Sequence, residues 1–359
     1  MRGDRTVNPR EKAMAEHPSF PWLEAGQTKE IEKLLRQKKW LAETEKIERA
    51  DRAGEGNMNL TLRIETNVRS FILKQARPWV EKYPDIEAPW ERSSLEQAFY
   101  VHVAQIPEVA SKMPYLIRVD SDTHITALEY LPGAKDLSSL YSGQNDPPLS
   151  VNEIEQLAAY LAALHEEGSG ADPTLFENRA MRELNHAHIF KVPLEQNNGL
   201  DLDAFEVGLQ AAAVSIKQDA DFIQAVRAHG QRYLKNGQTL LHGDFFAGSW
   251  LRTEIGLRVI DPEFAFLGSA EFDLGCALGH FALAQLPVSE ADFFLTEYAE
   301  RRGATLSFER IAQTAACEVM RRLIGVGQLP IQKTDGWRVD LLEKTRSALI
   351  QSQYRTLFI

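Results

Sequence analysis

The 359-residue sequence contains few of the features that identify a protein class quickly. Its two cysteines, Cys276 and Cys317, lie far apart in apolar surroundings, so we expect buried, reduced thiols in a cytoplasmic protein. No apolar run approaches the ~20 residues of a membrane span, and the charged N-terminus does not resemble a signal peptide. A formal net charge of −11 argues against a nucleic-acid partner. We therefore expect neither membrane nor nucleic acid among the partners.

The length favours two lobes, each able to bury its own core. Hydrophobic and charged shares of 44% and 25% are ordinary for a globular protein. The first third reads as mostly β and the remainder as mostly helical, which predicts an α+β fold. We expect a poorly ordered leader over residues 1–26, a first lobe over 27–131 and a second lobe over 132–359.

Hydrophobic periodicity places the elements of both lobes. In the first lobe it predicts helices over 27–41 and 91–103, and strands over 47–52, 60–66, 71–75, 115–119 and 125–130. In the second it predicts helices over 151–164, 272–286, 290–301, 308–324 and 339–358, with short helices within 176–193 and one or two within 202–234. Two short strands, at 240–241 and 257–260, interrupt this helical part.

The two short strands end in acidic residues. The first runs into His242-Gly243-Asp244, and the second into Asp261 and Glu263. If the strands are adjacent, one carboxylate can accept the proton of a substrate hydroxyl while the others hold Mg²⁺ on ATP phosphates. The order resembles the catalytic loop and metal-binding motif of kinases, with Ser249 in place of an asparagine. The alternative is a strand-turn-strand in which Asp244 caps a turn.

Three further features of the first lobe fit ATP binding, each with a plain alternative. Residues 54–59, which contain Gly54, Gly56 and Asn57, form either a phosphate-covering turn or an ordinary hairpin turn. Lys74 either grips phosphates or is a solvated strand end. Glu96 either pairs with this lysine or faces solvent near a helix N-terminus.

A hinge between the lobes is expected where residues 128–131 run into Pro132-Gly133. Backbone groups at Glu129 and Leu131 would read the adenine ring there. His242 is expected to brace the catalytic loop through a backbone hydrogen bond rather than to act in catalysis.

These motifs together resemble 5-methylthioribose kinase, a family of the aminoglycoside-phosphotransferase-like group with a two-lobed protein-kinase-like fold. The resemblance covers roughly residues 27–345 and rests on His-Gly-Asp-x-x-x-Gly-Ser at 242–249, Asp-Pro-Glu-Phe-Ala-Phe at 261–266 and Phe-Asp-Leu-Gly at 272–275. It implies an ATP- and Mg²⁺-dependent kinase of methionine salvage that phosphorylates the sugar 1-hydroxyl, and it suggests a homodimer.

The resemblance also implies residue roles. Asp244 would be the catalytic base, Asp261, Glu263 and Ser249 would hold the metal, and Lys74 would bind phosphates. The pair Arg321-Arg322 would bind the sugar or stabilise the transferred phosphoryl group, unless it is only a basic patch on an exposed helix face.

One departure from the family pattern concerns the sugar. Residues 268–271 read Gly-Ser-Ala-Glu in place of the usual Gly-Pro-x-Gly, so Glu271 adds a charge near the expected sugar pocket. The alternatives are a kinase for another pentose, a 5-deoxypentose or an amino alcohol, and, from another class, an inactive nucleotide-binding module. A metal-dependent hydrolase lacks a visible ligand set.

Overall fold

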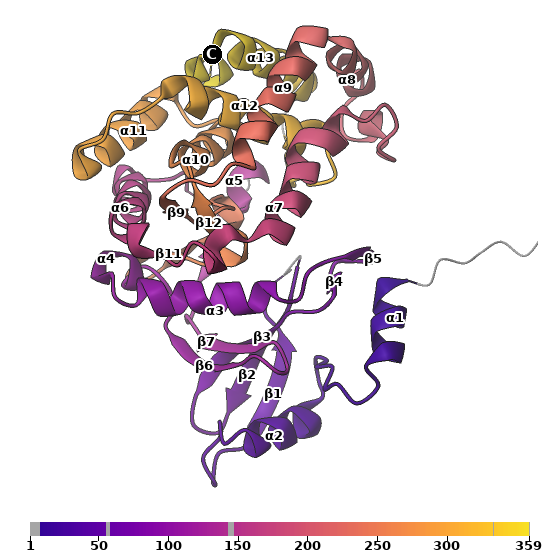
Figure 1. The fold of residues 1–359 in the computed structure, drawn as a ribbon, viewed down its shortest axis with the longest axis vertical. Coiled ribbons are helices and arrows are strands. Elements are labelled where there is room, and N and C mark those ends of the chain that lie inside the picture. Colours follow the sequence, from indigo (N-terminus) through magenta and orange to yellow (C-terminus); the bar gives the residue numbers. More distant parts are fainter. Residues whose placement is uncertain (1–7, 55–57, 143–146, 333, 359) are drawn as a thin grey trace, which may run out of the picture. The chain divides into compact units, whose positions relative to one another are not determined.

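The structure is a computed structural model that describes residues 8–54, 58–142, 147–332 and 334–358. The chain divides into two compact units. The first comprises the described residues up to Val101 together with Pro114–Pro132. The second comprises His102–Met113 and the chain from Gly133 onward. Figure 1 labels helices and strands of both units where there is room.

A five-stranded antiparallel sheet, in the order β1-β2-β3-β7-β6, forms the centre of the first unit (Figure 1). Its strands are β1 Ile47–Arg52, β2 Leu60–Thr66, β3 Ser70–Gln75, β6 Leu116–Asp120 and β7 Ile125–Glu129. Buried and partly buried residues alternate along all of β2, because every second residue faces the core. Helix α2, Thr28–Gln37, packs on β1 and buries Ile31 and Leu35.

The N-terminal segment corrects one expectation. Residues 8–26, expected to belong to a poorly ordered leader, contain helix α1, Pro9–Glu16, capped by the side chain of Asn8. Leu23 is buried, and its backbone N–H donates to Oε1 of Gln75 at 3.0 Å. Phe20 and Trp22 of this segment pack on Trp79 and Trp90. This aromatic packing orders the segment although most of its residues are polar. The unit is completed by β4 Trp79–Val80, β5 Tyr83–Glu87 and α3 Arg92–Val103, whose end belongs to the second unit.

The second unit is mainly helical. Its α-helices are α4 Pro107–Ala110, α5 Ser139–Ser142, α6 Val151–Glu167, α7 Arg179–His186, α8 Leu209–Gln218, α9 Ala220–Tyr233, α10 Glu271–Leu283, α11 Val288–Arg302, α12 Phe308–Ile324 and α13 Trp337–Gln351. A π-helical turn, Ala187–Lys191, follows α7, and a 3₁₀ segment, Tyr354–Phe358, ends the described chain. The predicted helix over 308–324 coincides with α12.

Helix α10 is the buried centre of this unit, with every residue from Phe272 to Leu283 buried. Its glycines let it approach α12 closely. A Cβ at Gly275 would come within 2.4 Å of Cβ of Thr314, and one at Gly279 within 3.0 Å of the Ala315 carbonyl oxygen. The close fit matters because these two helices carry the buried charges of the site described below.

Short strands connect the helices. They are β8 Lys135–Asp136, β9 Thr239–Leu241, β10 Trp250–Thr253, β11 Gly256–Val259 and β12 Phe266–Gly268. Strand β9 pairs with β12, whereas β11 pairs with β10, so the expectation that the two acidic strands are adjacent is wrong. Each of the two has a partner that the sequence did not reveal, because strands of three or four residues carry almost no periodic signal.

Candidate active site

The catalytic loop begins where β9 ends, and its first turn requires glycine. Gly243 has a φ of 82°, and a Cβ there would lie 2.0 Å from the carbonyl oxygen of Phe264. The close approach of these two backbones leaves no room for a side chain. Asp244 follows immediately, and its side chain keeps 25% of its accessible surface. The predicted base is thus held at the end of a buried strand with its carboxylate accessible.

Asp273, which sequence reasoning did not assign to the site, fixes this loop. Its Oδ2 accepts the backbone N–H of His242 at 2.7 Å, and its Oδ1 accepts that of Gly243 at 3.0 Å. Nε2 of His165 also contacts Oδ2, at 3.1 Å, and Nδ1 of His165 lies 2.9 Å from the hydroxyl of Tyr298. Burial lowers the pKa of His165 against the opposing influence of Asp273. The neutral ring therefore donates from Nε2 and accepts the tyrosine proton at Nδ1.

Hydrogen bonds to Ile260 bring the second acidic group to the loop. The Ile260 N–H donates to the backbone oxygen of Ser249 at 3.0 Å, and its carbonyl lies 3.0 Å from Nε2 of His242. The hydroxyl of Ser249 donates to the backbone oxygen of Asp244 at 3.1 Å. His242 therefore makes the backbone contact expected of it. The two loops approach one another through these bonds rather than through adjacent strands.

Asp261, which follows Ile260, has a left-handed backbone conformation with a φ of 63°. Such a conformation is strained for a non-glycine residue, and strained residues cluster at functional sites. Two positions on, the buried Glu263 has its backbone oxygen bound by Nδ2 of Asn178 at 3.2 Å. The same amide nitrogen donates to the Ala265 oxygen at 3.0 Å, so Asn178 fixes the acidic turn from outside.

The chemistry of this acidic turn fits Mg²⁺. Two carboxylates and a hydroxyl are the hard oxygen donors that this ion prefers. Mg²⁺ needs only one or two protein carboxylates when phosphates supply other ligands. In the described part of the chain no group of three His, Cys, Asp or Glu side chains could hold a metal ion.

Both predicted arginines reach Asp244 from helix α12. Nη2 of Arg321 lies 3.2 Å from Oδ1 of Asp244, and Nη2 of Arg322 lies 4.0 Å from the same oxygen. Their side chains are only 11% and 9% exposed, which excludes a basic patch on an exposed helix face. Sequence reasoning missed Glu318, one turn earlier, which contacts both guanidinium groups. A charged residue within the apolar stretch 315–320 was the available signal.

The lysine–glutamate pair expected in the first unit is present. Nζ of Lys74 donates to Oε1 of Glu96 at 2.7 Å, and both side chains are buried. The readings of Lys74 as a solvated strand end and of Glu96 as solvent-facing are therefore wrong. Gly54 is exposed with a φ of 71°, and Gly56 and Asn57 lie outside the described residues.

Two other first-unit residues were assigned to adenine. The carboxylate of Glu129 accepts the backbone N–H of Tyr115 at 3.2 Å, and Leu131 is partly buried. Neither observation tests adenine binding, which stays a prediction.

The Glu271 carboxylate is engaged within its own turn. Strand β12 pairs antiparallel with β9, so Gly268 pairs with Thr239 and Phe266 with Leu241. The chain leaves this ladder beside Thr239 and reaches Glu271, the first residue of α10, two positions before Asp273. There the Glu271 carboxylate accepts a hydrogen bond from the Ser269 hydroxyl.

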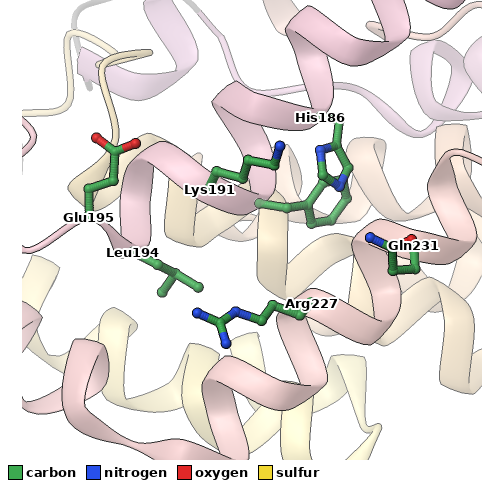
Figure 2. Close-up of a pocket in the computed structure, with 7 residues that line it drawn as sticks. His186, Lys191, Leu194, Glu195, Arg227 and Gln231 are labelled. Carbon is green, nitrogen blue, oxygen red and sulfur yellow. The ribbon is translucent and has the colours of Figure 1, made fainter.

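A separate pocket of about 440 Å³ lies elsewhere in the second unit (Figure 2). Its lining comes from α7, α9 and the segment between residues 190 and 195: His186, Phe190, Lys191, Leu194, Glu195, Arg227 and Gln231. None of the predicted site residues lines it, so we do not assign it to the reaction.

Together, the fold and these side chains define a phosphotransferase. A β-rich unit carries a buried lysine–glutamate pair, and a helical unit carries an accessible aspartate beside two arginines and an acidic turn. The family model described as the phosphotransferase enzyme family matches residues 49–310. The chain belongs to this family.

Curated relatives of this chain are named as kinases. A protein from Exiguobacterium sibiricum named methylthioribose kinase is 27% identical over 347 residues, which cover 84% of this chain and 85% of that protein. A protein of the same name from Escherichia coli is 27% identical over 315 residues, covering 84% of this chain and 72% of that protein.

A solved structure shares the fold. Spectinomycin phosphotransferase, solved with ADP and spectinomycin, gives a TM-score of 0.51 at 16% identity and covers 94% of this chain and 98% of that chain. The α+β, kinase-like fold predicted from the sequence is confirmed. No helix in the described ranges is long and apolar enough to span a membrane.

Proposed function

We propose that this protein transfers the γ-phosphoryl group of ATP to the 1-hydroxyl of 5-methylthioribose. The observation that carries the proposal is the convergence of Arg321 and Arg322 on Asp244. Asp244, as the base that takes a hydroxyl proton, then lies beside two guanidinium groups that can donate hydrogen bonds to phosphate or sugar oxygens. The names of the curated relatives support methylthioribose as the acceptor.

In the proposed reaction Asp244 orients the sugar hydroxyl and accepts its proton. The hydroxyl oxygen attacks the γ-phosphorus, and the bond from that phosphorus to the bridging oxygen breaks, so that ADP leaves with the electron pair. The two arginines balance the negative charge that is spread over the transferred group. Phosphoryl transfer demands mainly position and charge from the protein, and this site supplies both.

The nucleotide would be bound by residues of the first lobe. Lys74, held in place by Glu96, would bind ATP phosphates, and Gly54, Gly56 and Asn57 would contribute to the same function. Glu129 and Leu131 would present backbone groups to the adenine. We accordingly assign ATP binding to residues 27–131, and catalysis and sugar binding to residues 132–359.

The metal would be held by the carboxylates of Asp261 and Glu263, with the hydroxyl of Ser249. When bound, Mg²⁺ neutralises phosphate charge. The protein's own part is to keep these oxygen donors in place, through the hydrogen bonds to Ile260 and those from Asn178. An inactive module would not require the base, the acidic turn and the lysine pair at once, so the presence of the whole set favours an enzyme.

Cellular context forms part of the proposal. A role in methionine salvage follows if methylthioribose is the acceptor. Both cysteines are free and buried, which suits the reducing cytoplasm. The homodimer suggested by the family resemblance stays a prediction.

The test is an incubation with ATP, Mg²⁺ and a panel containing 5-methylthioribose, ribose, a 5-deoxypentose and choline. We expect ADP and a sugar 1-phosphate in equal amounts, with methylthioribose the best acceptor. A preference for choline or another amino alcohol would refute the proposed substrate. An absence of ADP with every acceptor would refute the proposed activity.

A further inference from the structure

We propose that Glu318 is a positioning residue that, supported by His280 and Tyr141, aims Arg321 and Arg322 at Asp244. The inference rests on the proposed phosphoryl transfer, because it concerns the same base. It does not depend on which alcohol is the acceptor.

The spacing on helix α12 lets one carboxylate serve two arginines. Residues three and four positions apart lie on the same helix face, so Glu318 faces both Arg321 and Arg322. Its Oε2 lies 2.7 Å from Nε of Arg321, and its Oε1 accepts from Nε of Arg322 at 2.8 Å. Glu318 thus contacts Nε of each arginine, the guanidinium nitrogen nearest the main chain. The Nη2 atom of each arginine lies toward Asp244.

The remaining nitrogens of the two guanidinium groups are also bound. Nη1 of Arg321 donates to Oδ1 of Asn185 at 3.1 Å. Nη1 of Arg322 donates to the Gly327 carbonyl at 3.2 Å, and its guanidinium carbon lies 4.9 Å from the centre of the Phe246 ring. Nε and Nη1 of each guanidinium thus lie within 3.2 Å of a partner other than Asp244, and the contact of Arg321 Nε with Glu318 is an ion pair without hydrogen-bond geometry. These contacts restrict the orientation of each fork.

Behind Glu318 a buried chain of hydrogen bonds runs to another helix. Nε2 of His280, on α10, lies 2.8 Å from Oε1 of Glu318, and Nδ1 lies 2.6 Å from the hydroxyl of Tyr141. A carboxylate can only accept, so Nε2 carries the proton and Nδ1 accepts the tyrosine proton. Both His280 and Tyr141 are buried. The Glu318 carboxylate therefore accepts from a neutral donor, His280, which Tyr141 orients in turn.

Charge balance supports the same assignment. Burial alone would raise the pKa of Glu318, but the charges of Arg321 and Arg322 hold it well below its usual range. Burial alone would lower the pKa of Arg321, yet the carboxylates of Glu318 and Asp244 raise it. Two adjacent buried guanidinium groups would repel each other without the intervening negative charge. Glu318 therefore supplies the charge that allows both to face the base.

The test compares Glu318→Gln with Glu309→Gln. The first variant keeps the shape and removes the charge, whereas the second makes the same change at an exposed position in the first turn of α12. With the best acceptor of the panel, we expect kcat/KM for the acceptor to fall about 100-fold in Glu318→Gln, as for a displaced catalytic group. The KM for ATP should stay unchanged, and Glu309→Gln should match the parent protein. Glu318→Asp, which retains the charge, should recover part of the loss.

Kinetics of Glu318→Gln equal to those of Glu309→Gln would overturn the proposal. A crystal structure of Glu318→Gln provides a readout that needs no activity. We expect Arg321 to leave Asp244, and a retained contact would overturn the proposal even if no acceptor were found, a result that would separately refute the proposed function. Should that variant fail to fold, Tyr141→Phe removes only the hydroxyl behind His280. A smaller fall in kcat with an unchanged KM for ATP is expected there, and parent kinetics would overturn the proposal.

Discussion

Nη2 of Arg321 lies 3.2 Å from Oδ1 of Asp244, although the two residues belong to segments 77 positions apart. The candidate base and a buried cation form one unit at the end of strand β9. Asp244 is tied to its loop by the backbone, and Arg321 to its helix by Glu318. Base and cation are therefore aligned by two independent sets of contacts, and each set can be removed separately.

The first prediction concerns the base. Asp244→Asn should lower kcat by about 10²- to 10⁴-fold, the range typical of a lost general base, because the amide cannot accept the hydroxyl proton. Affinity for ADP should hardly change, since Asp244 is not assigned to the nucleotide. Steady-state kinetics and calorimetric titration with ADP measure the two effects. Turnover close to that of the parent would remove Asp244 from this role.

The second prediction concerns the buried anchor of the loop. Asp273→Asn leaves a single amide oxygen for the two N–H groups of His242 and Gly243, so we expect a loss of about 3 kcal/mol in the free energy of unfolding, with a lower kcat. Asp340→Asn is a control, because its carboxylate is exposed and pairs with the exposed Lys344. Its change should stay within about 0.5 kcal/mol. Equal urea-denaturation curves for the two variants would contradict the anchoring role.

The third prediction concerns the acidic turn. Asp261→Ala and Glu263→Ala should each shift the Mg²⁺ titration of activity to higher concentration, by about tenfold or more, because each removes an oxygen donor. Glu254→Ala changes an exposed carboxylate in the turn between β10 and β11, and should leave the titration in place. Parent-like titrations in both test variants would show that the metal is held elsewhere.

The fourth prediction concerns pH. Burial lowers the pKa of His280 to about 4 from a value of 6.5, against the opposing influence of Glu318. Between these two values the unfolded chain binds a proton that the folded chain does not, so stability is full above pH 6.5 and falls as the pH falls toward 4. The loss from this residue is on the order of 3 kcal/mol.

His280→Gln tests this linkage, because glutamine can donate to Glu318 without titrating. The free energy of unfolding of this variant should fall less steeply than that of the parent on acidification through the same window. Identical slopes would mean that His280 does not contribute the acid sensitivity.

Much of the fold follows from local pattern. The predicted strand over 60–66 and helix over 308–324 match β2 and α12 at both ends, because each has a strong apolar period and clear end signals. The Lys74–Glu96 pair was one of two readings that the sequence left open, because both residues lie in elements that it placed well. The β9–β12 and β10–β11 pairings were not, because strands this short are set by the surrounding packing.

The buried polar contacts explain why the rest of the site was missed. Asp273 lies within one of the motifs that carry the family resemblance, yet its partners His242 and His165 are 31 and 108 residues away. Glu318 likewise depends on His280, 38 residues earlier. A sequence shows that such a residue is charged within an apolar stretch, but only the fold shows which groups its carboxylate contacts.

The final measurement compares kcat/KM for 5-methylthioribose with that for ribose, in the parent and in Glu271→Gly. An apolar wall for the methylthio group is worth ~1–3 kcal/mol, so the parent ratio should be about 10 to 200 in favour of methylthioribose. The ratio should be the same in Glu271→Gly, because the Glu271 carboxylate is engaged by the Ser269 hydroxyl. A parent ratio below one would contradict the central claim that this phosphotransferase acts on methylthioribose.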